Sequence, residues 1–286
     1  MRGLLVAALL VGCTGKDTDT ELDTDTDTDS DTISGDPIIA VAGERCALDE
    51  RIGAVTVEHW GGDTASFTAL IWDATDPWMG APSLTNDHCA FHSFDVNSCG
   101  RCDAGTVCSV SGECVPERRT VKDFVLVVDQ DGSQTEYTPT VDGYAYGQVA
   151  TGSAMGFELR LGGRAIVMEP ASVPSEPLGA SLSATGDYDT PGALTASWTD
   201  PGDGTRISTV IPINHHAGGP TFTVCEAAAS DEGFVADADM VNPLAVITGL
   251  EFQGLDHQHI AAAQVDGGCI EFALSRRVLV DVDFPR

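Results

Sequence analysis

A repeated alternation of apolar and polar residues in short runs is the feature that most constrains the fold of this chain. Apolar residues occupy every second position of residues 157–161 and of residues 194–198, with charged or hydroxyl residues between them. A period of two places successive side chains on opposite faces of a strand, so these runs indicate sheets with one face in water. Glycine, proline and aspartate lie between the runs and favour turns.

Similar runs recur along most of the chain. They lie at residues 55–57, 67–71, 124–128, 157–161 and 165–168, and then at 194–198, 207–213, 222–225, 244–247, 260–265, 270–274 and 278–284. About seven short strands with turns every ~8–12 residues, as in the second group, are typical of a β-sandwich. Only residues 237–241 fit a short helical turn. We therefore predict an all-β fold of two β-sandwich-like domains, the second immunoglobulin-like or similar.

Residues 169–178 contain three prolines and separate the two groups of runs. Proline lacks the N–H that a central strand donates, so this stretch is expected to be a linker or an edge crossing. We place the first β domain at residues 37–175, with a small disulfide-rich insert at residues 97–117, and the C-terminal β-sandwich at residues 176–286.

The N-terminus carries the features of an export signal. Arg2 is followed by a short apolar run that ends in small residues at Gly12, and this run is too short to span a bilayer. The residues that follow alternate carboxylates with hydroxyls. We predict a signal peptide at residues 1–12 and a disordered acidic linker at residues 13–36. Calcium binding is the alternative, but residues 17–32 lack the glycine that calcium loops use to turn.

Acidic residues dominate the charge of the chain. There are 44 acidic and 14 basic residues, a formal net charge of −30, and the acidity extends well beyond the linker. A field of this sign repels phosphate backbones, so we expect no nucleic-acid partner. Solubility explains such a charge, and specific cation binding is the alternative.

Cysteine usage agrees with export into an oxidising compartment. Apart from Cys13 the chain has an even number of cysteines, which favours four structural disulfides. These residues are Cys46, Cys89, Cys99, Cys102, Cys108, Cys114, Cys225 and Cys269. The middle four lie in a segment too small for a hydrophobic core, so two disulfides are expected to hold it, with a zinc site as the alternative. We expect Cys225 to pair with Cys269, and Cys46 with Cys89.

The chain contains none of the common catalytic sequence patterns. It lacks a G-x-S-x-G elbow, an H-E-x-x-H pair and a phosphate-binding glycine loop, so we assign no catalytic residue and no cofactor. Histidines provide an alternative with bound zinc or calcium. His257 and His259 are two residues apart on a predicted strand and share a face, so together with Asp256 they could bind a metal. Surface or hydrogen-bonded histidines are the simpler interpretation.

The tryptophans allow two interpretations. Trp198 lies on an alternating run and is expected in the core. Core packing is also favoured for Trp60, Trp72 and Trp78. If two of these three were exposed together, they would form a platform for sugars or peptides.

The sequence Leu10-Val11-Gly12-Cys13 resembles the lipobox of bacterial lipoproteins. This resemblance implies cleavage before Cys13, acylation of its thiol and amino group, and attachment to a membrane through lipid. Thr14 in place of aspartate resembles lipoproteins that are forwarded to the outer membrane. We therefore expect a lipid-anchored protein of the outer membrane and leave open which face it occupies.

The whole layout resembles uncharacterised lipoproteins of the myxobacterial type. Residues 194–198 resemble their strand that ends in tryptophan, and Val224-Cys225 with residues 231–234 resembles their cysteine and the turn that follows it. The cysteine spacing of residues 99–116 resembles a small insert of many bacterial cell-surface proteins. These resemblances imply a cell-envelope protein with a terminal sandwich, and they imply no activity.

Taken together, these features predict a non-enzymatic binding or structural module. Its expected partners are the membrane, through lipid, and an unidentified protein or glycan ligand. One alternative is a metal-binding protein or secreted hydrolase that uses the histidines of the second domain. The other is a carbohydrate- or peptide-binding surface module that uses exposed tryptophans.

Overall fold

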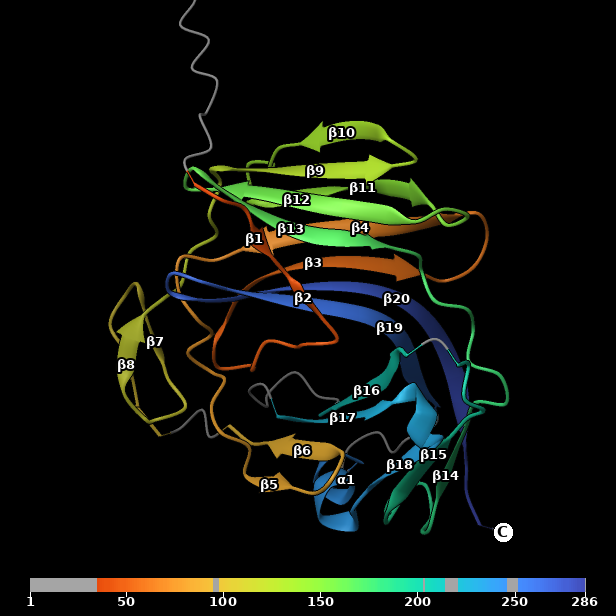
Figure 1. Cartoon of the computed structure of the whole chain (residues 1–286). Helices are drawn as coiled ribbons and strands as arrows, with labels where there is room; N and C mark the ends of the chain where they lie inside the picture. The colour runs from red at the N-terminus through yellow and green to blue at the C-terminus, as the bar shows by residue number, and fades with distance from the viewer. Residues whose placement is uncertain (1–34, 95–97, 203, 214–220, 246–251, 286) are drawn as a thin grey trace, which may run out of the picture. The chain divides into compact units, whose positions relative to one another are not determined.

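The computed structural model describes residues 35–94, 98–202, 204–213, 221–245 and 252–285. The predicted signal peptide, Cys13 and nearly all of the acidic linker lie outside these residues. Residues Ile33–Arg286 form one compact unit. Strands dominate it, so the predicted all-β fold is confirmed (Figure 1). Within the described ranges, no helix is long and apolar enough to cross a membrane.

One sheet has five strands in the order β1-β13-β12-β9-β10 (Figure 1). Its strands are β1 (Ile38–Ile39), β9 (Phe124–Gln130), β10 (Ser133–Tyr137), β12 (Met155–Leu161) and β13 (Arg164–Ala171). All neighbours are antiparallel except β1, which runs parallel to β13. The predicted alternation is present in β12, where Phe157 and Leu159 are buried and Glu158 and Arg160 pair on the opposite face.

The second sheet has 13 strands. Its main path is β11-β4-β3-β20-β19-β16-β17-β6-β5, while β2 pairs with β19, and β14, β15 and β18 form a branch that joins β20 through β14. The strands are β2 (Val41–Ala42), β3 (Arg51–His59), β4 (Thr64–Ile71), β5 (Leu84–Thr85), β6 (Cys89–His92), β11 (Tyr144–Ala150), β14 (Ser181–Ala184), β15 (Leu194–Ser197), β16 (Arg206–Pro212), β17 (Phe222–Ala228), β18 (Gly233–Ala236), β19 (Phe252–Val265) and β20 (Gly268–Asp283).

Among the described residues, helical structure is confined to the stretch around β18. A short 3-10 helix, η1 (Ala229–Asp231), precedes β18, and α1 (Ala238–Ala245) follows it. The helical turn predicted at residues 237–241 is thus present, but it continues to Ala245, where the start of a strand was expected. Met240, Val241 and Leu244 explain the difference, because their spacing puts all three on one buried helix face.

The two larger of three hydrophobic clusters share the longest strands. The first core combines buried residues of β9, β12 and β13 with those of β3, β4 and β11, and the second lies among β6, β14–β18 and α1. Strand β20 contributes Phe272 to the first core and Val282 to the second, and β19 contributes Ala261 and Leu255 in the same way. The two halves of the chain are therefore built around the same pair of strands.

The boundary predicted near residue 175 does not separate two sheets. Strand β3 comes from before this boundary, yet it pairs with β20 from the end of the chain, and β6 pairs with β17. Turn signals and prolines could not predict this arrangement, because the strand pairs are formed between segments far apart in the sequence. The expected linker instead ends near β19, where the Ser175 carbonyl contacts the His257 ring.

All eight cysteines within the described residues form disulfides. The pairs are Cys46–Cys269, Cys89–Cys225, Cys99–Cys108 and Cys102–Cys114. In the insert, β7 (Thr106–Cys108) and β8 (Cys114–Pro116) form a small hairpin held by two disulfides, as predicted. The expected pairs Cys225–Cys269 and Cys46–Cys89 are wrong. They assumed that each bond stays within one half of the chain, whereas the pairing of β6 with β17 puts Cys89 opposite Cys225.

Candidate functional site

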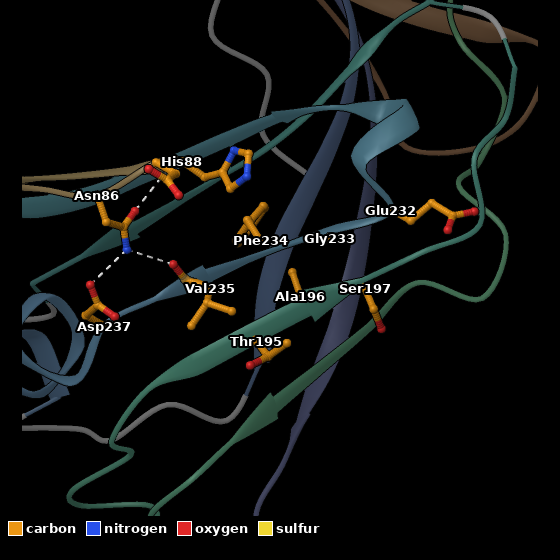
Figure 2. A pocket seen from close by; sticks show the side chains of 11 residues that line it. Asn86, His88, Thr195, Ala196, Ser197, Glu232, Gly233, Phe234, Val235 and Asp237 are labelled. Carbon is orange, nitrogen blue, oxygen red and sulfur yellow. Dashed lines mark hydrogen bonds between the residues drawn. The ribbon is translucent and has the colours of Figure 1, made fainter.

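A groove with a cavity volume of about 580 Å³ lies where the turn before β6 meets β15 and β18 (Figure 2). Its lining residues are Asn86, Asp87, His88, Thr195, Ala196, Ser197, Glu232, Gly233, Phe234, Val235 and Asp237. We call this surface the β18 groove. Three segments far apart in the sequence form it, so it exists only in the folded chain.

Strands β15 and β18 form one wall of the β18 groove. They run antiparallel, with Thr195 opposite Val235 and Ser197 opposite Gly233. Leu194, Ala196, Phe234 and Ala236 of these strands are buried, and Ala196 and Phe234 also line the groove. Residues 194–198 and 231–234, which carried the resemblance to the lipoproteins, therefore lie side by side.

The chain enters β18 through a tight turn. Glu232 ends η1 with a φ of 57°, in the left-handed region that non-glycine residues seldom adopt. A Cβ at Gly233 would lie 2.6 Å from the carbonyl oxygen of Ala196, so this position requires glycine. Trp198 is buried, as predicted, and its indole N–H donates to the Ala229 carbonyl at 2.7 Å. The tryptophan thereby holds the turn that places Glu232 in the groove.

Asn86 connects the opposite wall to β18. Its Oδ1 accepts hydrogen bonds from the backbone N–H groups of His88 at 3.1 Å and Cys89 at 2.7 Å. Its Nδ2 donates to the carbonyl oxygen of Val235 and to the carboxylate of Asp237, both at 3.0 Å (Figure 2). The amide thus uses two acceptor and two donor positions. These four bonds fix the distance between the two walls.

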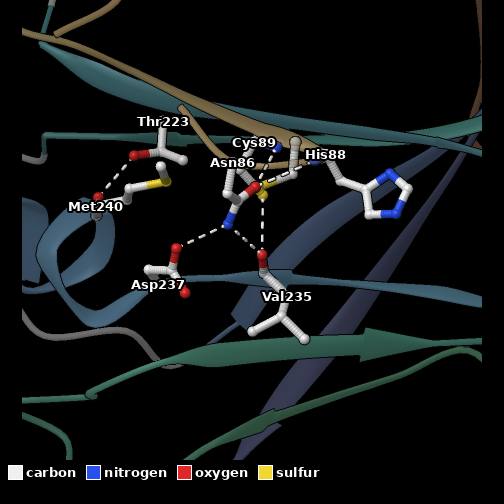
Figure 3. The surroundings of a disulfide bond; sticks show 8 residues. Asn86, His88, Cys89, Thr223, Val235, Asp237 and Met240 are labelled. Atoms are coloured by element: carbon white, nitrogen blue, oxygen red, sulfur yellow. Dashed lines mark hydrogen bonds between the residues drawn. A yellow bond between two sulfur atoms is a disulfide. The ribbon is translucent and has the colours of Figure 1, made fainter. Parts of the chain in front are cut away.

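The Cys89–Cys225 disulfide lies beside this contact (Figure 3). Cys89 in β6 and Cys225 in β17 are direct neighbours across the two strands, and both are buried. The Sγ atom of Cys89 lies 3.5 Å from the carbonyl oxygen of Val235. The covalent bond and the Asn86 amide together hold β6, β17 and β18 in one fixed arrangement.

The β18 groove offers polar groups without an assembled catalytic centre. These groups are the carboxylates of Asp87, Glu232 and Asp237, the hydroxyls of Thr195 and Ser197, and the ring of His88. Among the described lining residues, no hydrogen bond joins the His88 ring to either hydroxyl, so no nucleophile is paired with a base. Carboxylates and hydroxyls gathered in one groove suit the binding of a ligand that brings hydrogen-bond donors.

The structure does not bring together the three residues predicted to bind a metal. Both histidines are on one face of β19, but Asp256 is on the other, because side chains alternate along a strand. Asp256 instead accepts two hydrogen bonds from the Arg277 guanidinium, each at 2.6 Å. This carboxylate raises the pKa of Arg277.

Each of the two histidines has a different environment. His257 is fully buried, and its two ring nitrogens contact the carbonyl oxygen of Ser175 and the hydroxyl of Thr205. His259 is half-buried and lines a separate cavity of about 350 Å³ beside β13 and β16. His257 therefore fits the simpler interpretation, that of a hydrogen-bonded histidine.

Only one set of potential metal ligands clusters in the part of the chain that the structure describes. Donor atoms of Cys99, Cys102 and Cys114 lie within 4.8 Å of one another. All three sulfurs are joined in disulfides, and the thiolates that zinc requires are therefore not formed.

The other tryptophans differ from the favoured prediction of core packing. Trp60 is 56% exposed and Trp78 is 41% exposed, whereas Trp72 is half-buried with the Arg118 guanidinium 4.1 Å from its ring. Trp60 follows β3 and Trp72 follows β4, so these antiparallel strands keep the two rings roughly 25 Å apart. The core prediction is wrong for Trp60 and Trp78, and Trp60 forms no shared platform with Trp72.

Comparison with known proteins gives no family for this chain. No protein-family model matches it, and no curated protein sequence matches it. A solved structure that is similar in part belongs to a study of host cell surface retention of a 1.5-MDa bacterial ice-binding adhesin. The identity is 8%, the match covers 82% of this chain and 66% of that chain, and the TM-score is 0.16. A likeness of this size supports no inference about function.

Sequence reasoning missed Asn86, Glu232 and Asp237 as residues of the site. Asn86-Asp87 is a recognisable turn signal, but the residue that Asn86 contacts in β18, Val235, lies 149 positions later in the sequence. Glu232 precedes glycine, which signals a turn and gives no hint of a groove. The shape of the site depends on these long-range contacts.

Proposed function

We propose that this chain is a lipid-anchored, non-enzymatic binding module of the cell envelope, and that the β18 groove holds its ligand. The observation that carries the proposal is a preformed groove whose walls are fixed by Asn86 and by the Cys89–Cys225 disulfide. A preformed cavity with a few polar groups in fixed positions is the usual form of a ligand site.

Sequence features support the lipid anchor. Residues 10–13 fit a lipoprotein processing site, and four disulfides fit the oxidising compartment that an exported protein enters. In this proposal the acylated Cys13 attaches the protein to the outer membrane. Replacing Cys13 with serine is expected to move the protein from the membrane fraction to the soluble fraction. Unchanged membrane attachment of this variant would contradict the anchor.

The groove supports a ligand with exposed hydrogen-bond donors, either a protein segment or a glycan. Ser197→Trp adds a large side chain in the wall and is expected to weaken binding at least tenfold, since a tryptophan occupies much of a cavity of this size. Ser183→Trp is the matched control, because Ser183 is exposed on the adjoining strand β14 and does not line the groove. Binding of fractionated envelope peptides and polysaccharides is measured by calorimetry. Equal binding by both variants would exclude this groove.

A second candidate function, glycan binding, is favoured by the surroundings of Trp60. The Arg277 guanidinium lies 5.2 Å from the Trp60 ring, and Asp256 holds this guanidinium with two hydrogen bonds. One face of an exposed ring is thus supported, which leaves the other face for the apolar side of a sugar. Neutral envelope polysaccharide is expected to change the tryptophan fluorescence of the wild type and of Trp78→Ala, but not of Trp60→Ala. The same response from all three proteins would contradict this function.

A further inference from the structure

The edge of the large sheet at β11 is uncharged in a chain that is otherwise strongly acidic. β11 pairs with β4 on one side, and no described strand is hydrogen-bonded to its other side. Residues 143–157, which include all of β11, contain neither a charged residue nor a proline. Charges and prolines are the usual protection of an edge strand, because its open backbone groups can pair with another strand. β11 has neither kind of protection.

Hydrogen bonds at the two ends of β11 show which backbone groups point outward. The N–H of Ala150 donates to the side-chain amide of Gln130 at 3.2 Å, and its C=O accepts from the same amide at 2.6 Å. The C=O of Tyr144 accepts from the turn before the strand at 2.8 Å. Backbone groups of every second residue point to the same side of an antiparallel strand. Those of Tyr146 and Gln148 therefore also point away from β4.

No hydrogen-bonded strand covers the centre of this edge, although β10 of the other sheet lies close to β11. Both Tyr146 and Gln148 are exposed, Tyr146 to 65%. Across the described residues, no hydrogen bond reaches the N–H or C=O groups of these two residues from outside β4. The backbone N–H and C=O groups of Tyr146 and Gln148 thus form a short unpaired stretch of the edge, symmetric about Gly147. We call this stretch the opening.

We propose that this opening pairs with the same opening on a second copy of the chain. Two antiparallel β11 strands related by a twofold axis at Gly147 place Tyr146 of one copy opposite Gln148 of the other. Each of these two residue pairs exchanges two hydrogen bonds. Together they satisfy the open backbone groups of Tyr146 and Gln148 in both copies.

The symmetry of the open groups about Gly147 favours a second copy as the occupant, and the charge limits where it can dock. Two copies with a net charge of −30 each repel one another through most of their surfaces, and the uncharged β11 edge is where this repulsion is smallest. The edge also packs closely on the core, since a Cβ at Gly147 would lie 2.6 Å from the Phe67 ring and 3.0 Å from the Tyr137 ring. The contact area is small, so the dimer is expected to be weak and dependent on concentration.

Sedimentation equilibrium of residues 33–286 tests the dimer, since this compact unit contains both cores and all four disulfides. The wild type is expected to associate reversibly, and Tyr146→Lys/Gln148→Lys to associate about tenfold more weakly, because the lysines face one another across the pair. Ser66→Lys/Thr68→Lys is the matched control. These residues lie on the same face one strand further in, opposite Gln148 and Tyr146, so the association is expected to persist.

Two outcomes would overturn the proposal. One is a wild type that stays monomeric at millimolar concentration, and the other is an equal loss of association in the Ser66→Lys/Thr68→Lys control. Circular dichroism confirms that each variant is folded. If the double lysine variant does not fold, Gln148→Glu replaces it and is expected to weaken association in the same direction.

Cross-linking tests the register independently. Tyr146→Cys and Gln148→Cys proteins are expected to form a disulfide with one another when they are mixed, because these positions face each other in the proposed pair. Each protein alone is expected to cross-link more slowly. Faster cross-linking of either protein with itself would overturn the twofold axis at Gly147.

Discussion

Strands β18 and β11 both lie at edges of the large sheet, yet their outer edges differ in what covers them. At β18 the carbonyl of Val235 accepts a hydrogen bond from Asn86, which belongs to a turn far earlier in the chain. At β11 the side chain of Gln130 covers only the end of the strand, at Ala150. One edge is closed by a distant segment, and the other is closed at its ends and open at its centre.

A carboxamide covers the edge in both cases, for a common reason. It has a donor and an acceptor on adjacent atoms, as a peptide group has, so it can replace part of a neighbouring strand. Asn86 also bonds its own turn and therefore fixes the position of a whole segment, which creates the groove. Gln130 only limits the length of the opening. The comparison shows that covering an edge and building a site can be the work of one side chain.

The largest test of this comparison removes the covalent part of the β18 closure. Cys89→Ser/Cys225→Ser is expected to lower the free energy of unfolding by about 4 to 5 kcal/mol, because the bond closes a loop with a sequence separation of 136. Urea denaturation measures the change. Cys102→Ser/Cys114→Ser is the control, with a separation of only 12 and an expected loss of about 3 kcal/mol or less. An equal effect of both pairs would contradict the role assigned to the closure.

Removing the amide of Asn86 is expected to have the next largest effect. Asn86→Ala leaves four hydrogen-bonding groups without their partner, at a cost of about 2 kcal/mol, since the site is half-buried and water replaces part of the loss. Faster amide hydrogen exchange in β18, with unchanged exchange in β11, is the expected signature.

Asn86→Asp separates the two halves of the amide. It keeps the acceptor for His88 and Cys89 but turns a carboxylate toward Asp237, so the variant is expected to gain stability on acidification.

The corresponding substitution at β11, Gln130→Ala, is expected to change the free energy of unfolding little and the strength of the proposed dimer measurably. Gln130→Ala removes two partly exposed hydrogen bonds and should cost about 1 kcal/mol or less. It also extends the opening to Ala150, so the proposed dimer should become tighter. Gln134→Ala, in the neighbouring β10, is the control, because its amide bonds the Asp129 carboxylate and not β11. Tighter association of both variants would argue against the opening as the contact.

The smallest expected effect is a pH dependence near the closed edge. Burial lowers the pKa of His92 below its ordinary value of 6.5, while a backbone hydrogen bond at Gly80 and the charge of Asp49 oppose this shift. The unfolded chain then takes up a proton at a higher pH than the folded chain. The free energy of unfolding should fall as pH decreases through about 6.5 and level off once the folded ring is protonated. His92→Gln should flatten this slope in urea titrations, and an unchanged slope would assign it to other groups.

The sequence predicted the local features of this protein better than its long-range contacts. Alternation in residues 157–161 and 194–198 correctly indicated half-buried strands, and the buried position of Trp198 followed from the same pattern. Side-chain alternation also decides against Asp256 as a ligand beside His257, since neighbours on a strand face opposite ways. Applied to that triplet, the same rule would have excluded the carboxylate.

Long-range pairing was beyond what the patterns contain. Cys89 was expected to bond Cys46 because both precede the proline-rich stretch, but β6 lies beside β17 and brings it to Cys225. The groove depends on the same contacts, because Asn86 meets Val235 only once these strands are paired. Turn signals, caps and alternation describe neighbours in the sequence. The burial of the whole core decides which strands become neighbours in space.

The Cys46–Cys269 disulfide has a mechanical consequence. It joins a residue near the start of the compact unit to one in the last strand, with a sequence separation of 223. A pull on the N-terminal end, such as a membrane tether would exert, meets this bond after the short strands β1 and β2. From there the covalent path runs through the disulfide directly into β20. Pulled by its two ends, even a fully unravelled domain would extend only by the short segments outside the bond, because the stretch between Cys46 and Cys269 is bypassed.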